Sequence, residues 1–240
     1  MMIDPVRLSR GEPSPWSGGV PIFVRAFDRA TGKFEKPVFV GYGGRDRDVH
    51  NTPAMTVDSK GILHVILMGH NDPAFYSHTL RPDEISAWTA PTPINVAPDK
   101  NYGCRASYLA LTCDRHDNLH FMFRSSSDYY NHRLDMITKN AGTETWNSAR
   151  SVFVPLTDNY HVWAHSLAYD PVRDHLFMCY YEGWGDGGTK DLDSFWRFYF
   201  PVRSPSEGVV LISKDSGKTW SHATTPDFLQ SSKVPKNSSP

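Results

Sequence analysis

Residues 107–124, SYLALTCDRHDNLHFMFR, are two runs of apolar residues separated by a turn that begins with an aspartate. The same pattern occurs earlier as HNTPAMTVDSKGILHVILMGH at residues 50–70, and later as HSLAYDPVRDHLFMCYY at residues 165–181. The first turn aspartates of the three copies stand 56 residues apart, at positions 58, 114 and 170. Each copy predicts a strand, a turn in which the aspartate side chain bonds backbone amides, and a second strand. A strand-rich unit repeated at this spacing predicts the four-stranded blade of an all-β propeller.

A second turn motif is more specific. Residues 213–220, SKDSGKTW, match the Asp-box pattern Ser-x-Asp-x-Gly-x-Thr-Trp at every defined position. We expect Asp215 to accept backbone N–H bonds, Gly217 to take a backbone conformation that a Cβ disfavours, and Trp220 to lie between neighbouring sheets. Such a motif indicates a fold and does not specify a reaction.

The repeats define the domain organisation. Residues 20–40 resemble the outer hairpin of a preceding blade, so the chain contains three full units and half of another. A closed propeller needs at least four blades. We therefore predict that residues 1–240 form one partial β-propeller domain, with residues 228–240 as a disordered polar tail.

Composition excludes some partners. A net charge of −1 argues against a broad nucleic-acid surface, which needs a basic excess. No apolar run approaches the roughly 20 residues of a membrane-spanning helix, so no membrane partner is expected. The start, MMIDP at residues 1–5, lacks the charged and apolar regions of a secretory signal. The protein either stays inside the cell or lacks its true N-terminus here, and the incomplete repeat favours the second interpretation.

Four polar residues are predicted to meet at one end of the blades. His50 begins the first strand of its unit and His70 ends the second, and Tyr108 and Arg124 hold the same two places in the next unit. Antiparallel neighbours bring the beginning of one strand beside the end of the next, so all four lie at one mouth of the central channel. The Asp215 turn follows a third strand and is expected at the opposite end.

Each of these residues also has a structural interpretation. His64 and His120 recur in register, six residues after their aspartates, and are predicted to pack within the blades. His50 and His70 do not recur, which favours function. Tyr108 could be aromatic packing, and Arg124 could be a surface side chain whose stem lies along apolar residues.

Other candidate ligands lie in the third unit. His161 and His165 are four residues apart and would share one face of a strand, where they could bind zinc together with Cys179. Trp184, within the glycine-rich segment 182–188, could stack on a sugar ring. No cofactor is expected to be required, and a structural zinc or calcium ion is an open possibility.

The segments DVHNTPA at residues 48–54 and GHN at residues 69–71 resemble the BNR-4 family. That family includes propeller polysaccharide lyases that act on ulvan, a sulfated algal polymer of rhamnose and uronic acids. The resemblance covers roughly residues 20–225 and implies a seven-bladed parent fold. It also implies a secreted or periplasmic protein, expected to be a monomer, whose partner is an acidic sulfated polysaccharide. The site residues that it implies are catalytic His50, His70, Tyr108 and Arg124, and substrate-binding Asn51, Asn71 and either Tyr169 or Tyr160.

These residue types suit β-elimination at a uronic acid. A base removes the proton next to the carboxylate, the carboxylate charge must be neutralised, and an acid protonates the leaving oxygen. Arg124 can hold a carboxylate or a sulfate with paired N–H donors, and Tyr108 beside a positive charge can serve as base and then as acid. His50 is assigned to charge neutralisation, and His70 to support or to base duty.

Two competing functions are open. A sialidase-like glycoside hydrolase shares the Asp box, but it needs three arginines around a carboxylate. The chain has no Phe/Tyr-Arg-Ile-Pro motif, and Arg25 in FVR at residues 23–25 is a poor substitute. The other competitor is a non-catalytic glycan-binding propeller, for which the many aromatic residues would suffice.

Overall fold

The chain is seen here in a computed structural model that describes most of its central part. The described residues form strands and turns and contain no helix. They are 19–44, 52–67, 73–96, 106–126, 132–154, 165–182 and 207–223.

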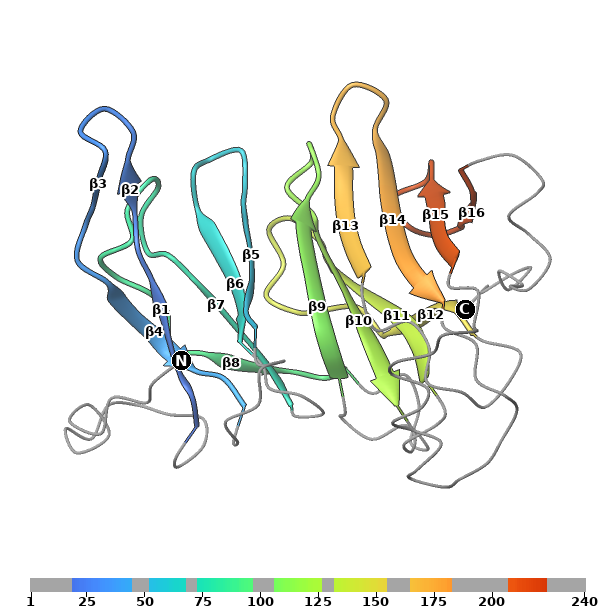
Figure 1. The fold of residues 1–240 in the computed structure, drawn as a ribbon, viewed down its shortest axis with the longest axis horizontal. Coiled ribbons are helices and arrows are strands. Elements are labelled where there is room, and N and C mark those ends of the chain that lie inside the picture. The colour runs from blue at the N-terminus through green and yellow to red at the C-terminus, as the bar shows by residue number, and fades with distance from the viewer. Residues whose placement is uncertain are drawn as a thin grey trace.

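Three four-stranded antiparallel sheets lie side by side, and in each the strand order follows the chain (Figure 1). Blade 1 consists of β5 (Ala54–Val57), β6 (Leu63–Leu67), β7 (Ala74–His78) and β8 (Thr92–Ile94). Blade 2 consists of β9 (Ala106–Cys113), β10 (Leu119–Ser126), β11 (His132–Lys139) and β12 (Arg150–Phe153). Blade 3 consists of β13 (His165–Asp170), β14 (His175–Glu182), β15 (Glu207–Ser213) and β16 (Ser221–His222). The predicted strand–turn–strand repeat is therefore present three times.

A shorter unit precedes blade 1. Strands β1 (Pro21–Val24) and β4 (Val38–Tyr42) form a two-stranded sheet, and β2 (Phe27–Asp28) and β3 (Lys33–Phe34) form a hairpin between them. The two-stranded sheet packs against blade 1 through a buried apolar cluster. This unit corresponds to the predicted half blade.

The first strands of the blades, β5, β9 and β13, are neighbours, as expected of strands that line a propeller channel. The described sheets do not close into a ring, and the two-stranded sheet and blade 3 lie at opposite ends of the row (Figure 1).

The repeated turns have the predicted chemistry. Oδ1 of Asp58 accepts hydrogen bonds from the amides two and four residues later, and Oδ1 of Asp114 does the same. Oδ1 of Asp170 accepts from the amides two and three residues later. Each aspartate thus satisfies two backbone donors that the strand ladder leaves open.

The two recurring histidines are structural, as predicted. His120 is fully buried, and its Nε2 donates to Asp114 Oδ2 over 2.9 Å. His64 is 9% exposed, shares a 2.7 Å hydrogen bond with the hydroxyl of Tyr76, and lies 3.5 Å from Asp58 Oδ2. In blade 2 the histidine hydrogen-bonds the turn aspartate, and in blade 1 it lies close to it.

The Ser213–Trp220 segment also forms the expected turn. The Thr219 amide donates to Asp215 Oδ1 over 2.8 Å, and the Gly217 amide donates to Ser213 Oγ over 2.7 Å. Gly217 has a φ of 79°, in the left-handed region. Trp220 packs against the apolar cluster between blades 2 and 3.

Side chains between neighbouring turns join the blades at this end. Ser59 in blade 1 donates from both its amide and its hydroxyl to the carboxylate of Asp117 in blade 2. Arg115 in blade 2 forms a 2.8 Å ion pair with Asp174 in blade 3. We call this end of the blades the turn end, and the opposite end, where Tyr108 lies, the site end.

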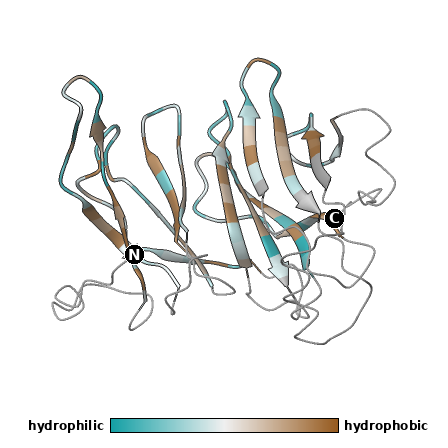
Figure 2. Ribbon diagram, in the orientation of Figure 1, coloured by the Kyte–Doolittle hydropathy of each residue, from teal (hydrophilic) through white to brown (hydrophobic). Residues whose placement is uncertain are grey.

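The core consists of apolar layers between adjacent blades. One buried cluster joins Ile66 and Ala74 of blade 1 to Phe121 and Phe123 of blade 2. A second joins Met122 and Leu134 of blade 2 to Met178 and Leu211 of blade 3. Each fully buried Ile, Leu, Met or Phe side chain contributes about 1.5–3 kcal/mol. Figure 2 shows hydrophobic residues distributed along the strands of all three blades, in keeping with this layered core.

Among the described residues, none lies in a helix with the length and apolarity needed to cross a bilayer. The predicted tail, residues 228–240, is outside the described ranges, so its predicted disorder stays a prediction.

Candidate functional site

Two of the four residues predicted to be catalytic, Tyr108 and Arg124, lie in described strands of blade 2. Tyr169 and Cys179 lie in described strands of blade 3. The remaining sequence candidates are outside the described ranges, or have only their backbone described. Outside are His50, Asn51, His70, Asn71, Tyr160, His161 and Trp184. His165 begins β13, but its side chain is not described.

A β-bulge places Tyr108. Ser107 of β9 pairs with Arg124 of β10, and the next paired residues are Ala110 and Met122. Strand β9 therefore has one more residue than β10 between these pairs. Tyr108 is the extra residue and has a φ of 54°. For a residue with a side chain, this left-handed conformation costs about 1–2 kcal/mol, and bulges with such residues are common beside active sites.

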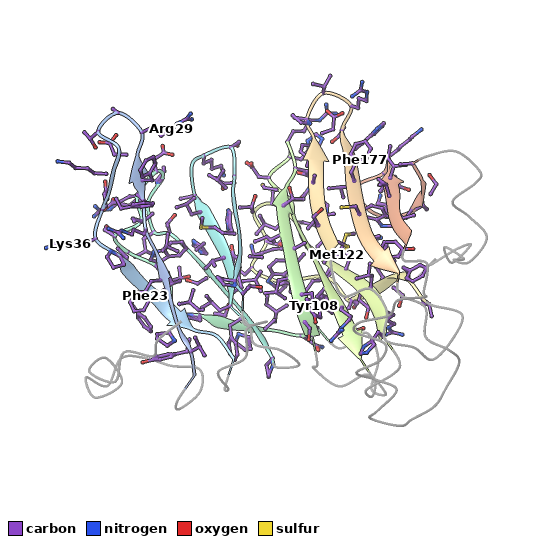
Figure 3. The ribbon with its side chains drawn as sticks, viewed as in Figure 1. Phe23, Arg29, Lys36, Tyr108, Met122 and Phe177 are labelled. Carbon is purple, nitrogen blue, oxygen red and sulfur yellow. The ribbon has the colours of Figure 1, made fainter. Side chains whose placement is uncertain are left out.

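The bulge turns the Tyr108 ring toward Arg124. The guanidinium carbon of Arg124 lies 4.5 Å from the centre of that ring. Arg124 is two residues beyond Met122 and so shares the face of blade 2 that packs against blade 3. A regular strand would direct Tyr108 to the other face, because residue 107 pairs with Arg124 and successive side chains alternate. Figure 3 shows Tyr108 near the site end of β9.

Arg124 is only 1% exposed, whereas Tyr108 is partly exposed. The sequence-based expectation was that Arg124 would hold a substrate carboxylate or sulfate directly. In the described structure its charge is instead buried against the ring of Tyr108. A desolvated cation is strongly attracted to the face of an aromatic ring. The guanidinium of Arg124 therefore holds the ring of Tyr108 in its orientation.

His132 is a further candidate that the sequence reasoning missed. It begins β11, pairs with Ser126 at the site end, and is 5% exposed. It stands two residues before the buried Leu134 and so shares the face of Arg124. The sequence signal for His132 is the alternation of side chains along β11. This alternation assigns His132 to the face of Arg124 only when Leu134 is known to face blade 3.

A buried polar network holds the site end of blade 2 in place. The fully buried carboxylate of Asp135 accepts hydrogen bonds from Ser125 and Ser151, the latter over 2.8 Å. Arg133 adds a charged hydrogen bond of 3.0 Å from its Nε. The network links β10, β11 and β12 on the opposite face of blade 2 from Arg124, and satisfied networks of this kind rigidify their surroundings.

The structure does not bring Tyr169 together with Tyr108 and Arg124. Tyr169 lies at the end of β13, next to the turn aspartate Asp170, and its hydroxyl donates to Asp174 Oδ1 over 2.6 Å. Burial and this carboxylate raise the pKa of Tyr169, so it is a hydrogen-bond donor at the turn end.

The described residues do not test the metal hypothesis. Among them, no group of three or more His, Cys, Asp or Glu side chains is placed to bind a metal ion. The predicted zinc ligands include His161, which is outside the described ranges, and His165, whose side chain is not described. Cys179 is exposed, and its Sγ lies 2.8 Å from Ser166 Oγ.

The architecture is that of a β-propeller. Its blades are four-stranded antiparallel sheets arranged around their first strands, with a polar pair at one end and aspartate turns at the other. Residues 21–233 match the model of the BNR repeat-containing family, and the chain belongs to that family. This confirms the resemblance found in the sequence. No curated protein sequence matches the chain.

The chain is also similar in fold to solved polysaccharide lyases. One is an ulvan lyase of polysaccharide lyase family PL25, with a TM-score of 0.58 and 14% identity, where 84% of this chain covers 48% of the other. The same lyase has been solved bound to -[GlcA(1-4)Rha3S]-, with the same values. Another is the polysaccharide lyase Uly1, with a TM-score of 0.52 and 15% identity, covering 83% of this chain and 49% of the other. The chain thus spans about half the length of these structures.

Proposed function

We propose that this chain is part of a polysaccharide lyase that cleaves a uronate-containing sulfated polysaccharide, such as ulvan, by β-elimination. The observation that carries the proposal is the bulge that places the partly exposed Tyr108 over the buried guanidinium of Arg124. Strain at a single residue and a buried charge are both costly, and functional sites are where proteins retain them. Membership of the family and the fold shared with polysaccharide lyases support the same reaction class.

In this proposal Tyr108 is the catalytic base and acid. The cation beneath its ring favours the phenolate, which removes the proton from the carbon next to the uronate carboxylate. The electron pair of that C–H bond forms the new double bond as the bond to the glycosidic oxygen breaks. The phenol then returns the proton to the leaving oxygen. Arg124 acts through the tyrosine, so it is a positioning residue.

The histidines supply the remaining roles. We assign His50 to neutralising the substrate carboxylate and His70 to support of the base, because imidazoles near neutral pH can donate a hydrogen bond or carry a charge. Asn51 and Asn71 would bind sugar hydroxyls beside them, and Trp184 would stack on a ring. These steps require no cofactor. The substrate is an extracellular polymer, so we propose that the protein is exported, and we propose that it acts as a monomer.

A non-catalytic glycan-binding propeller is the second candidate. The burial of Arg124, which is 1% exposed, weakens its expected contact with a substrate carboxylate and so leaves room for this candidate. A sialidase-like hydrolase lacks such support, and the arginine motif that it needs is missing from the sequence. The three functions differ in product, because only a lyase creates an unsaturated uronate.

The test is to incubate the chain with ulvan and to follow the ultraviolet absorbance of the unsaturated uronate. We expect absorbance to rise, and we expect Tyr108→Phe to slow the rise by about 100-fold or more, as is typical when a general base is removed. Tyr169→Phe is the matched control, because it removes the same hydroxyl at the turn end, and its rate should stay near wild type. Thermal unfolding checks that both variants fold. Unchanged turnover in folded Tyr108→Phe contradicts the assignment, and shortening of the polymer without absorbance indicates a hydrolase.

A further inference from the structure

A cleft lies at the turn end, away from Tyr108. It is formed between the β11–β12 connection of blade 2 and the Ser213–Trp220 turn of blade 3, and its volume is about 760 Å³. We call it the turn-side cleft. Clefts of several hundred Å³ suit a small-molecule ligand or one to two sugar rings.

The turn-side cleft is lined by two cations and by no acidic side chain of the described residues. Arg150 enters it from β12, and Lys218 enters it from the turn of blade 3. The nearest acidic group that acts on Arg150 is Asp215. Both oxygens of that carboxylate already accept hydrogen bonds within its own turn, from Ser213 and Thr219. The carboxylate of Asp215 keeps its charge and acts on Arg150, but its oxygens are occupied within the turn, so two cations line the cleft beside one carboxylate.

The donors of Arg150 are available. Within the described ranges, its guanidinium makes no hydrogen bond and no ion pair, although the side chain is partly buried. Burial lowers the pKa of Arg150, and the charge of Asp215 opposes this effect. A planar guanidinium binds sulfate and carboxylate with two parallel N–H bonds, so an oxyanion would oppose it further.

Neutral groups beside the cations match a saccharide. The side chains of Asn140, Asn147, Ser148 and Ser216 line the same cleft and make no hydrogen bonds to other described residues. Amides and hydroxyls both donate and accept, as do sugar hydroxyls. Three of the four, Asn140, Asn147 and Ser148, are exposed, so the cleft opens to solvent.

We infer that the turn-side cleft is a second binding site, for an anionic saccharide whose sulfate or carboxylate lies on Arg150 and Lys218. It holds the polysaccharide away from the Tyr108 end and has no part in bond cleavage. The inference takes its class of ligand from the proposed function, but the residues that carry it lie at the opposite end of the blades, so either can fail without the other.

The test is calorimetric binding to the Tyr108→Phe chain, in which cleavage is not expected. The probes are a sulfated uronate disaccharide, its desulfated form, a neutral disaccharide and inorganic sulfate. We expect Arg150→Gln and Ser148→Asp each to weaken binding of the sulfated probe by about tenfold or more, since each removes one charged interaction or adds a repulsion. Ser148 is exposed, so its variant tests the site even where Arg150→Gln fails to fold.

Controls separate the possible outcomes. Lys218→Ala should weaken binding, whereas Lys60→Ala, which removes a lysine from a turn of blade 1 outside the cleft, should not. Competition by inorganic sulfate identifies the sulfate as the bound group, and equal binding of the desulfated probe identifies the carboxylate. Equal binding of the neutral probe, or unchanged affinity in Ser148→Asp, overturns the inference. Activity that persists in Tyr108→Phe refutes only the proposed reaction.

Discussion

Gly217 shows how much a single residue can determine at the junction of two blades. Its φ is 79°, and a Cβ built there would overlap the terminal methyl of the buried Met136 in blade 2. Gly142 also has a positive φ, of 72°, but a Cβ there would meet nothing within 4 Å. The two glycines share the backbone requirement and differ only in the space around them.

We therefore predict unequal costs for the same substitution. Gly217→Ala should lower the free energy of unfolding by about 2–4 kcal/mol, because backbone strain and overpacking add. Gly142→Ala should lower it by about 1 kcal/mol, from backbone strain alone. Urea unfolding of both variants measures the difference. Equal losses would show that the turn of blade 3 does not press on Met136.

Tyr108 is the other residue whose backbone is informative. A left-handed φ costs any residue with a side chain, and a glycine at this place would remove that cost. The tyrosine is retained where its ring meets a buried guanidinium. The strain is thus found at the residue whose ring contacts this guanidinium.

At the scale of the element, the repeated turn aspartates differ in the side chains that hydrogen-bond to their carboxylates. Burial alone would raise the pKa of Asp114, but hydrogen bonds from His120 and Asn118 outweigh it and lower the pKa to about 2. Asp170 has the exposed Arg173 as its side-chain partner instead. One fold element therefore has a buried form in blade 2 and a solvated form in blade 3.

The pKa of Asp114 predicts a pH dependence. The folded-state pKa, about 2, is below the value of about 3.9 in an unfolded chain, so the carboxylate stabilises the fold above about pH 4 and loses this effect as the pH falls toward 2. A difference of nearly two pKa units corresponds to about 2–3 kcal/mol. Asp114→Asn should lower the free energy of unfolding by about this amount at neutral pH and flatten its decline in acid.

The control for this element is Asp170→Asn, which changes the equivalent turn without a buried histidine. Its loss of stability should be clearly smaller in the same urea titrations at neutral and acidic pH. If the two variants lose equal stability, the bond between His120 and Asp114 contributes nothing beyond the turn itself.

At the scale of the molecule, the two faces of blade 3 have different surroundings. Met178 and Leu211 are buried against blade 2, whereas Ala168 and Cys179 lie on the other face and are exposed. No described residue covers that face. An uncovered sheet face is what a propeller presents where the next blade would pack.

Thiol labelling tests this arrangement. Cys179 should react with N-ethylmaleimide in the folded chain at neutral pH. Cys113 should not, because burial, together with the charges of Asp117 and Asp114, raises its pKa to about 12. Peptide mapping by mass spectrometry identifies the labelled residue, and unfolding in urea should expose both. Protection of Cys179 in the folded chain would mean that another segment or a second copy covers this face.

The sequence by itself determined the blades. Their boundaries follow from the 56-residue repeat, and their turns follow from aspartates at positions 58, 114 and 170 that bond amides two to four residues away. The packing role of His64 and His120 was predictable for the same reason, because a residue that recurs in register belongs to the repeated scaffold. All of these interactions are local or periodic, so one strand–turn–strand unit contains the information.

Only the tertiary structure decided where the polar residues act. The bulge at Tyr108 depends on how β9 pairs with β10, and the burial of Arg124 depends on blade 3 packing over it. The cleft beside Arg150 depends equally on contacts between blades 2 and 3. A sequence pattern shows which face of a strand a residue occupies, but a register shift of one residue changes that face. The residues that pack against that face come from segments far away in the chain.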